Sequence, residues 1–151
     1  MWRALVLAVS LAAPAAPAAA QVVVEGDLIL LGRTSWRLWG VDAPDSRQWC
    51  PDGWPAGIMA KTYLSNLIQG RMVACEAKAQ DSKGNTVGIC RADGFDLGAA
   101  MVRNGMAWAY LRFTSEYADE EANARAMGLG LHQHPCEPAW QWRERRNQSR
   151  D

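Results

Sequence analysis

The alternation of apolar and polar positions is clearest near the start of the chain, over residues 23–45 (VVEGDLILLGRTSWRLWGVDAPD). Short apolar runs bounded by turn residues predict one strand near residue 23, a second over 28–31 and a third over 36–41. An acidic turn at 25–27 and a Gly-Arg turn connect them. We therefore expect one rigid sheet that brings polar side chains to a common rim.

A helix is predicted after these strands. Apolar side chains at 59, 60, 63, 64, 67 and 68 fall on one face of a helix over 56–69, which follows Pro55 and ends before Gly70. Two further strands are predicted over 72–79 and 86–92, joined by a polar turn. The helix is expected to cover one end of a barrel.

Two more helices are predicted in the second half of the chain. Asp96 can cap a helix that runs through residue 104, and residues 106–110 are extended. A third helix begins at Thr114 or Ser115 and ends near residue 128. Its early turns are acidic, as the helix dipole favours, and are expected to face solvent: Glu116, Asp119, Glu120 and Glu121.

The amino terminus has the pattern of a secretory signal peptide. An apolar run over 4–13 precedes PAAPAAAQ, whose alanines form a small-residue cleavage site, and the run is too short to anchor in a bilayer. We expect removal of residues 1–20 and export to the periplasm or the extracellular medium. The mature domain is predicted over 21–146, with Trp140 and Trp142 packed on it, followed by a frayed tail over 147–151.

The net charge of the chain limits how it could bind nucleic acid. The chain has 16 basic and 16 acidic residues, and removal of residues 1–20 takes away Arg3 and no acid, which leaves a net charge of −1. Proteins that grip long DNA by charge alone are distinctly basic. Any nucleic-acid contact is therefore expected to be local. The length gives a single domain with one core, and we expect a monomer without a transmembrane segment.

Four cysteines in an exported chain predict two disulfides, with three possible pairings. Cys75 and Cys90 flank a turn at almost equal distances, which would place them opposite each other on paired strands. That pairing leaves Cys50 to bond Cys136. A zinc site is the alternative, but its ligands are spaced poorly for structural zinc, and the histidines are expected in a loop: His132, His134 and Cys136.

The predicted rim carries the chemistry. Asp27 begins a strand, Arg37 lies within the next one, and Asp42 and Asp45 follow its end. Because adjacent strands lie about 4.8 Å apart, carboxylates on either side of the hairpin can converge. Oxygen-only ligands favour Ca²⁺ or Mg²⁺. A divalent ion beside an arginine is suited to holding a phosphodiester.

The same residues resemble a known family. EGD and RLWGVDAPD are similar to the pattern of the thermonuclease (staphylococcal-nuclease-like) family, roughly a DGDT turn followed by RLxGIDAPE. The likeness continues through GxxAxxxL at 57–64, DSKGNTVGIC and DLGAAMVRNGMAWAY, and covers almost all of the mature chain. It implies an α+β fold, a five-stranded OB-fold β-barrel with three α-helices, and an ancestor that cut nucleic acid.

The resemblance also implies roles for the rim residues. Asp27, Asp42 and the backbone carbonyl of Ala43 match the family's Ca²⁺ ligands. Asp45 stands where the family has a glutamate that activates or orients the attacking water, and it is one methylene shorter. Arg37 matches the arginine that holds the phosphate.

Other positions depart from the family pattern. Asn85 stands where a second arginine steadies the charge on the phosphoryl oxygens, and a neutral amide cannot do the same. Loss of such a group costs about 10²- to 10⁵-fold in rate. Lys83 in the same turn, or Arg47, could supply the charge. Tyr110 and Phe113 match two nucleotide-pocket tyrosines, and Phe113 lacks the hydroxyl.

Two functions follow from these observations. The first is a secreted Ca²⁺-dependent nuclease of low activity, acting on the phosphodiester bonds of DNA or RNA, which the resemblance favours. The second is a non-catalytic OB-fold module that binds a ligand or partner in the cell envelope. Asn85, Asp45 and the neutral charge favour this second function.

Overall fold

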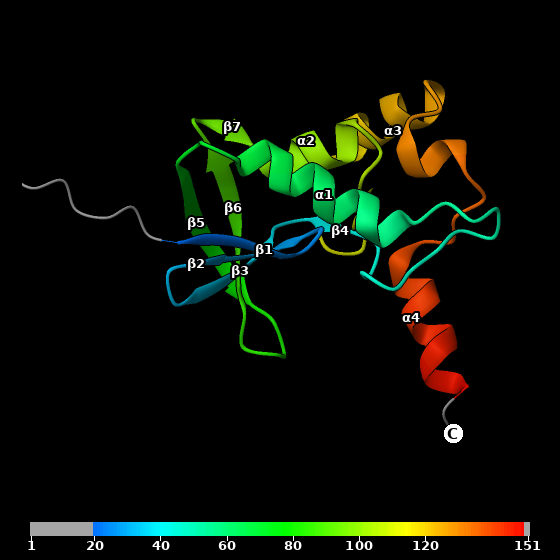
Figure 1. The fold of residues 1–151 in the computed structure, drawn as a ribbon, viewed down its shortest axis with the longest axis horizontal. Coiled ribbons are helices and arrows are strands. Elements are labelled where there is room, and N and C mark those ends of the chain that lie inside the picture. Colours follow the sequence, from blue (N-terminus) through cyan, green and yellow to red (C-terminus); the bar gives the residue numbers. More distant parts are fainter. Residues whose placement is uncertain (1–19, 150–151) are drawn as a thin grey trace, which may run out of the picture.

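A computed structural model describes residues 20–149, so the predicted signal peptide lies outside the described residues except for Ala20. The polypeptide forms a curved β-sheet with helices packed against it (Figure 1). The main sheet follows the order β1-β2-β3-β6-β5, with β7 paired to β6, and β4 and β8 form a separate two-stranded sheet. The strands are β1 (Gln21–Glu25), β2 (Leu28–Leu31), β3 (Thr34–Leu38), β4 (Val41–Asp42), β5 (Val73–Gln80), β6 (Thr86–Ala92), β7 (Phe95–Asp96) and β8 (Trp108–Ala109).

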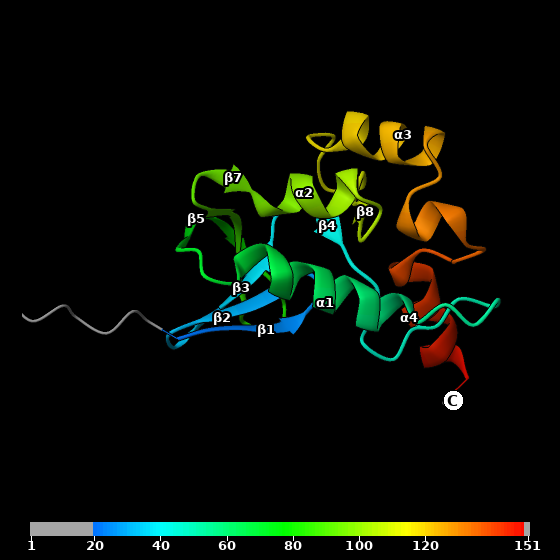
Figure 2. The same ribbon diagram turned by 45° about the horizontal axis from the view of Figure 1, so that its top comes forward.

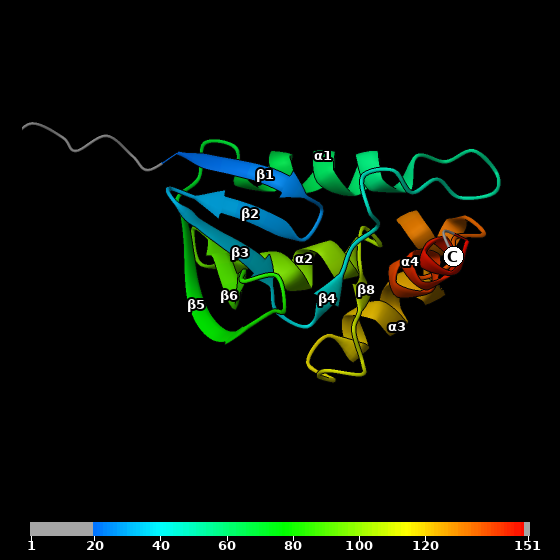
Figure 3. The same ribbon diagram turned by 90° about the horizontal axis from the view of Figure 1, so that it is seen from below.

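The sheet is open along one seam. β1 and β5 are its two edges, and the sheet curls so that the edges approach each other (Figure 3). The side-chain amide of Gln21 joins them, because its Oε1 accepts from the Val73 backbone N–H at 2.8 Å and its Nε2 donates to the Arg71 carbonyl at 2.8 Å. The α+β, OB-type class is as predicted, but one side chain replaces the last row of backbone pairing in the expected closed barrel.

The helices differ from the prediction in number. Residues 20–149 contain four α-helices where three are expected. The helices are α1 (Ala56–Ile68), α2 (Leu97–Arg103), α3 (Ala118–Ala126), the 3-10 helix η1 (Gly130–Gln133) and α4 (Ala139–Gln148). α1 packs on β1 and α2 on β6 (Figure 2). α4 lies at the opposite end of the molecule from β5 (Figures 1 and 3). Helix α4 continues to Gln148. The prediction of a frayed tail from residue 147 is therefore wrong for residues 147 and 148.

The third helix also begins later than predicted. Thr114 accepts the Glu116 backbone N–H at 3.2 Å, which closes a short turn, and helix α3 starts only at Ala118. The intervening Tyr117 is buried and donates its hydroxyl to Asp96 at 3.0 Å. The prediction that the whole acidic cluster faces solvent is wrong for Glu121. Its side chain is buried, and Oε1 accepts from Arg125 at 3.1 Å.

Two apolar clusters hold the elements together. The larger lies between the sheet and helices α1 and α2, and includes Ile29, Leu38, Leu64, Leu97 and Met101. The smaller surrounds the base of α4 and contains Cys50, Ala56, Trp108, Leu131 and Ala139. None of the helices in the range 20–149 is long and apolar enough to cross a bilayer.

Candidate active site

A cleft of about 780 Å³ opens where the β1–β2 turn, β3, β4 and the β5–β6 turn meet. It gathers nearly all the candidates named from the sequence, together with Asp81 and Arg143, which were not named. The lining includes Asp27, Arg37, Asp42, Ala43, Asp45, Lys83, Asn85, Tyr110 and Arg143.

Asp27 occupies the floor of this cleft. Gly26 before it allows the turn to sit against α1, since a Cβ there would lie 2.7 Å from the Ala60 Cβ. The Asp27 carboxylate is buried and accepts from Arg37 Nη1 at 2.8 Å and from the Ala43 backbone N–H at 3.1 Å. Hydrogen bonds from a charged donor and a backbone amide stabilise this buried anion.

Asp42 is the second buried carboxylate. Strand β4 pairs with β8, placing Asp42 opposite Trp108, and the side chain accepts from Arg143 Nη2 at 2.7 Å. Burial raises the pKa of Asp42 above its ordinary value, the charge of Asp27 adds to this, and the bond from Arg143 opposes it. The repulsion between the two carboxylates means that a cation near both would be stabilised.

Arg37 is held between two acids. Besides Asp27, it donates from Nε to Asp81 Oδ2 at 3.2 Å. Asp81 also accepts the side chain of Asn85 at 2.7 Å and the backbone N–H groups of Asn85 and Lys83. Partial burial acts to raise the pKa of Asp81, but these bonds, with that from Arg37, lower it to about 2. Asn85 therefore supports Asp81, which in turn orients Arg37.

Asp45 lies at the mouth of the cleft. Two contacts fix its turn: Glu25 accepts the Ser46 backbone N–H at 3.0 Å, and Gly57 packs so closely that a Cβ would lie 1.9 Å from the Asp45 carbonyl oxygen. Partial burial acts to raise the pKa of the Asp45 carboxyl, but hydrogen bonds from Arg47 hold it below its ordinary value. Arg47 is thus engaged with Asp45 and does not line the cleft.

Of the three residues predicted to form a nucleotide pocket, two line the cleft and one does not. Tyr110 lines the cleft and packs on Trp140 of α4, with ring centroids 5.5 Å apart. Lys83 lines it from the β5–β6 turn. Phe113 lies outside the cleft and packs against Trp39, with ring centroids 4.7 Å apart. Half of the surface of Phe113 is exposed.

Arg143, like Asp81, is a cleft residue that sequence reasoning missed. It comes from α4, and its side chain is 42% exposed while bonded to Asp42. The alternation of tryptophan and base in the tail was the available signal. Trp142 is buried and Trp140 packs on the smaller apolar cluster, so both tryptophans are structural, as predicted. Arg143, the residue after Trp142, lines the cleft.

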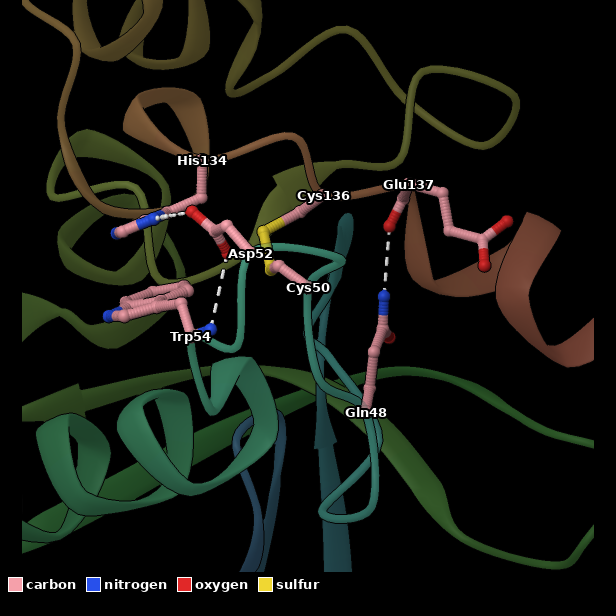
Figure 4. Close-up of a disulfide and its surroundings, with 7 residues drawn as sticks. All are labelled: Gln48, Cys50, Asp52, Trp54, His134, Cys136 and Glu137. Carbon is pink, nitrogen blue, oxygen red and sulfur yellow. Dashed lines mark hydrogen bonds and ion pairs between the residues drawn. A yellow bond between two sulfur atoms is a disulfide. The ribbon is translucent and has the colours of Figure 1, made fainter.

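The position of α4 is fixed by contacts with the loop before α1 (Figure 4). Cys50 and Cys136 form a disulfide that links segments 86 residues apart. Beside it, buried Gln48 donates to the Glu137 carbonyl at 2.9 Å. His134 lies in a turn, as expected, and makes a hydrogen bond of 2.7 Å with Asp52, whereas the expectation of a loop is wrong for His132, which belongs to η1.

The second disulfide, Cys75–Cys90, joins directly opposed residues of β5 and β6. The structure thus contains the pairing expected from the turn between these cysteines. The sulfur of Cys136 is bonded to Cys50 and is not free to bind zinc together with His132 and His134.

The oxygen atoms of the cleft fit a hard cation in chemistry and only partly in number. Asp27 and Asp42 offer two buried carboxylates without nitrogen or sulfur donors. Within residues 20–149 there is no cluster of three or more Asp, Glu, His or Cys side chains arranged for a metal. A bound Ca²⁺ would therefore need main-chain, water or phosphate oxygens for the rest of its ligands.

Residues 35–134 match the family described as "Staphylococcal nuclease homologue". The chain belongs to this family. The match contains Arg37, Asp42, Asp45 and Asn85, whereas Arg143 lies beyond it.

Individual relatives agree with the family assignment. The Escherichia coli protein named ParB is 34% identical over 131 residues, covering 76% of this chain and 70% of its own. The Micrococcal nuclease of Shigella flexneri is 31% identical over 139 residues, with 80% and 76% covered. An uncharacterized endonuclease of Haemophilus influenzae is 32% identical over 111 residues, or 71% of this chain and 58% of its own length.

Proposed function

We propose that this protein is an exported, Ca²⁺-dependent nuclease that hydrolyses phosphodiester bonds of DNA or RNA. The observation that carries the proposal is the convergence, in one cleft, of two buried carboxylates, an oriented arginine and a third carboxylate at the mouth. Family membership and relatives named as nucleases support it. Two disulfides are consistent with an oxidising compartment, the periplasm or the extracellular medium.

The chain's own residues would perform the following steps. Arg37, held by Asp27 and Asp81, donates to a non-bridging oxygen of the phosphodiester. Asp45 accepts a hydrogen bond from the attacking water and takes its proton as the water oxygen bonds to phosphorus. One P–O ester bond breaks in the same displacement, and the leaving oxygen takes a proton from solvent.

Ca²⁺, when bound, would add positive charge beside the phosphate. Asp27, Asp42 and the Ala43 carbonyl are the proposed ligands. For Asp42 to serve, its bond to Arg143 must be released or shared, and the raised pKa of the carboxyl shows that the carboxylate is not fully compensated by that one bond. Tyr110, on the same cleft wall, is placed to stack on a base.

The chain's charge limits the substrate contact. Net charge is close to zero, so binding would rest on the cleft itself and not on a basic face. A single-stranded segment suits this geometry, because unpaired bases can reach Tyr110 while one phosphate enters the cleft. We propose a monomer as the active unit, because the proposed steps use no residue of a second copy.

A non-catalytic binding module remains the second candidate, and one observation favours it. Asn85 is engaged by Asp81 and Asp45 by Arg47, so two positions expected to act on substrate are already paired. The experiment that separates the two is digestion of end-labelled single-stranded DNA and RNA in millimolar Ca²⁺ and in EDTA.

Variants make this digestion specific to the cleft. Asp42→Asn keeps an acceptor for Arg143 and removes the charge, so we expect at least about a 100-fold loss of cleavage. Asp119→Asn removes one exposed acid from α3 and serves as the control, with unchanged cleavage expected. Equal cleavage by both variants, or none by the unaltered protein, would leave the binding module as the function.

A further inference from the structure

The cleft contains an arginine, Arg143, whose hydrogen-bonding capacity is mostly unused. Arg37 donates from Nη1 to Asp27 and from Nε to Asp81, and Asn85 donates from its side-chain amide to Asp81. Arg143 makes a single hydrogen bond within residues 20–149, from Nη2 to Asp42. Its Nη1 and Nε remain available, and 42% of its side chain is exposed.

Arg143 also lies among the charged side chains of the cleft. Its charge contributes to lowering the pKa of Asp45 and opposes the rise at Asp42, and the charge of Arg37 in turn acts on Arg143. Arg37 and Arg143 are therefore two like charges held near each other in one cleft. Each is already balanced by a carboxylate, Asp27 or Asp42, so a phosphodiester between them would be held by their remaining N–H donors.

The placement of Arg143 is rigid enough for this role. Its helix is fixed by the Cys50–Cys136 disulfide, and buried Trp142 is the neighbouring residue. Trp140 packs against Tyr110 and Trp108 at the back of the cleft. A group held in advance at its working position loses little entropy when substrate binds.

We propose that Arg143 is a catalytic residue that binds the phosphoryl oxygens opposite Arg37 and stabilises the negative charge that builds up there, the role that the neutral Asn85 cannot fill. This inference rests on the proposed nuclease function. A planar guanidinium can bind two phosphoryl oxygens at once, which an amide or an ammonium cannot do in the same geometry. The two cations then come from β3 and α4, which lie far apart in the chain.

The test compares Arg143→Gln with Arg145→Gln, which removes the same charge from an exposed position on the same helix. At saturating Ca²⁺ we expect kcat for a short single-stranded oligonucleotide to fall at least about 100-fold in Arg143→Gln and to stay unchanged in Arg145→Gln. Arg143→Lys should recover only part of the loss, because it lacks the bidentate fork. Circular dichroism confirms that each variant is folded.

A purely structural role would give a different pattern. If Arg143 only positioned Asp42, the loss in Arg143→Gln would appear as a higher Ca²⁺ requirement and would disappear at saturating Ca²⁺. That result would overturn the proposal. We expect the opposite: the half-saturating Ca²⁺ concentration stays the same or falls, since Arg143 no longer competes for Asp42, while kcat remains low.

Binding without catalysis distinguishes failure of this proposal from failure of the nuclease function. Anisotropy of a labelled oligonucleotide is measured in EDTA, where we expect Arg143→Gln to bind about 10-fold more weakly than Arg145→Gln. If the unaltered protein cleaves nothing but this difference is found, the nuclease function fails and Arg143 is a phosphate-binding residue without a catalytic role. Equal binding by the two variants, together with equal kcat where cleavage occurs, would overturn the proposal.

Discussion

Asn85 donates a hydrogen bond of 2.7 Å from its side-chain amide to Oδ2 of Asp81. The same oxygen accepts from Arg37 Nε at 3.2 Å, so Asp81 connects Asn85 to Arg37. Asn85 therefore has a structural role of its own, besides lacking the charge of an arginine. It completes a hydrogen-bonded turn that holds Arg37, the proposed phosphate ligand, in place.

Removal of the Asp81 charge should affect both stability and its dependence on pH. The pKa of Asp81 is lowered to about 2 in the folded protein, so its contribution is present above the unfolded value of about 4 and is lost as pH falls toward 2. We expect Asp81→Asn to reduce the free energy of unfolding at pH 7 by about 1 kcal/mol after allowance for solvent screening.

Urea denaturation at pH 7 and pH 3 measures this effect, with Asp119→Asn as the exposed control. The difference between Asp81→Asn and the unaltered protein should shrink at the lower pH. A difference that stays constant across this range would show that the Asp81 charge is not stabilised by its partners.

Arg47 should set the pH dependence of cleavage through Asp45. Hydrogen bonds from Arg47 keep the pKa of the Asp45 carboxyl below its ordinary value. In Arg47→Ala this pKa should rise, so the acidic limb of kcat/KM against pH should move to higher pH. Arg33→Ala, in the exposed β2–β3 turn, is the control and should leave the profile in place. An unshifted acidic limb in Arg47→Ala would exclude Asp45 as the group that accepts the proton.

The two disulfides should differ in their effect on activity. Replacing both Cys50 and Cys136 by alanine releases the base of α4, and we expect kcat to fall toward that of Arg143→Gln, with about 4 kcal/mol of stability lost. The matched pair without Cys75 and Cys90 should lose about 3 kcal/mol and keep its kcat at a temperature where it is folded. Equal kcat values for the two cysteine-free pairs would contradict a role for α4 in the cleft.

Gly57 should be intolerant of any side chain. A Cβ at this position would lie 1.9 Å from the Asp45 carbonyl, so Gly57→Ala must push the Asp45 turn away from α1. We expect a loss of about 1–3 kcal/mol in unfolding free energy and a lower kcat, because Asp45 moves. Thermal melts and cleavage assays check this, with Lys61→Ala on the exposed face of α1 as the control. Unaltered kcat in Gly57→Ala would mean that the position of Asp45 is not critical.

The sequence was sufficient for features determined by local pattern. The two strands that flank Asp27 and the strand that carries Arg37 follow from two-residue alternation and turn residues, and the resemblance placed Asp42 beside them. Cys75 and Cys90 are opposed because a single turn separates their strands. Such features depend on residues close in the chain, where spacing constrains geometry strongly.

Features that depend on distant packing could not be obtained in this way. Arg143 reaches Asp42 across 101 residues of sequence, and only the folded base of α4 brings them together. Glu121 fits the pattern of a solvated helix face, but packing of α3 buries it against Arg125. Phe113 is likewise turned toward Trp39 by the fold around it, and nothing in its local sequence indicates this.

The most direct test of the account is a crystal structure with Ca²⁺ and a short single-stranded oligonucleotide whose phosphates carry non-bridging sulfur to slow cleavage. The quantities to measure are the distances from one phosphate to the guanidinium nitrogens of Arg37 and Arg143. We predict hydrogen bonds from both to the same phosphate, with Ca²⁺ beside Asp27 and Asp42. A phosphate bound outside this cleft, or Arg143 pointing away from a phosphate held by Arg37, would contradict it.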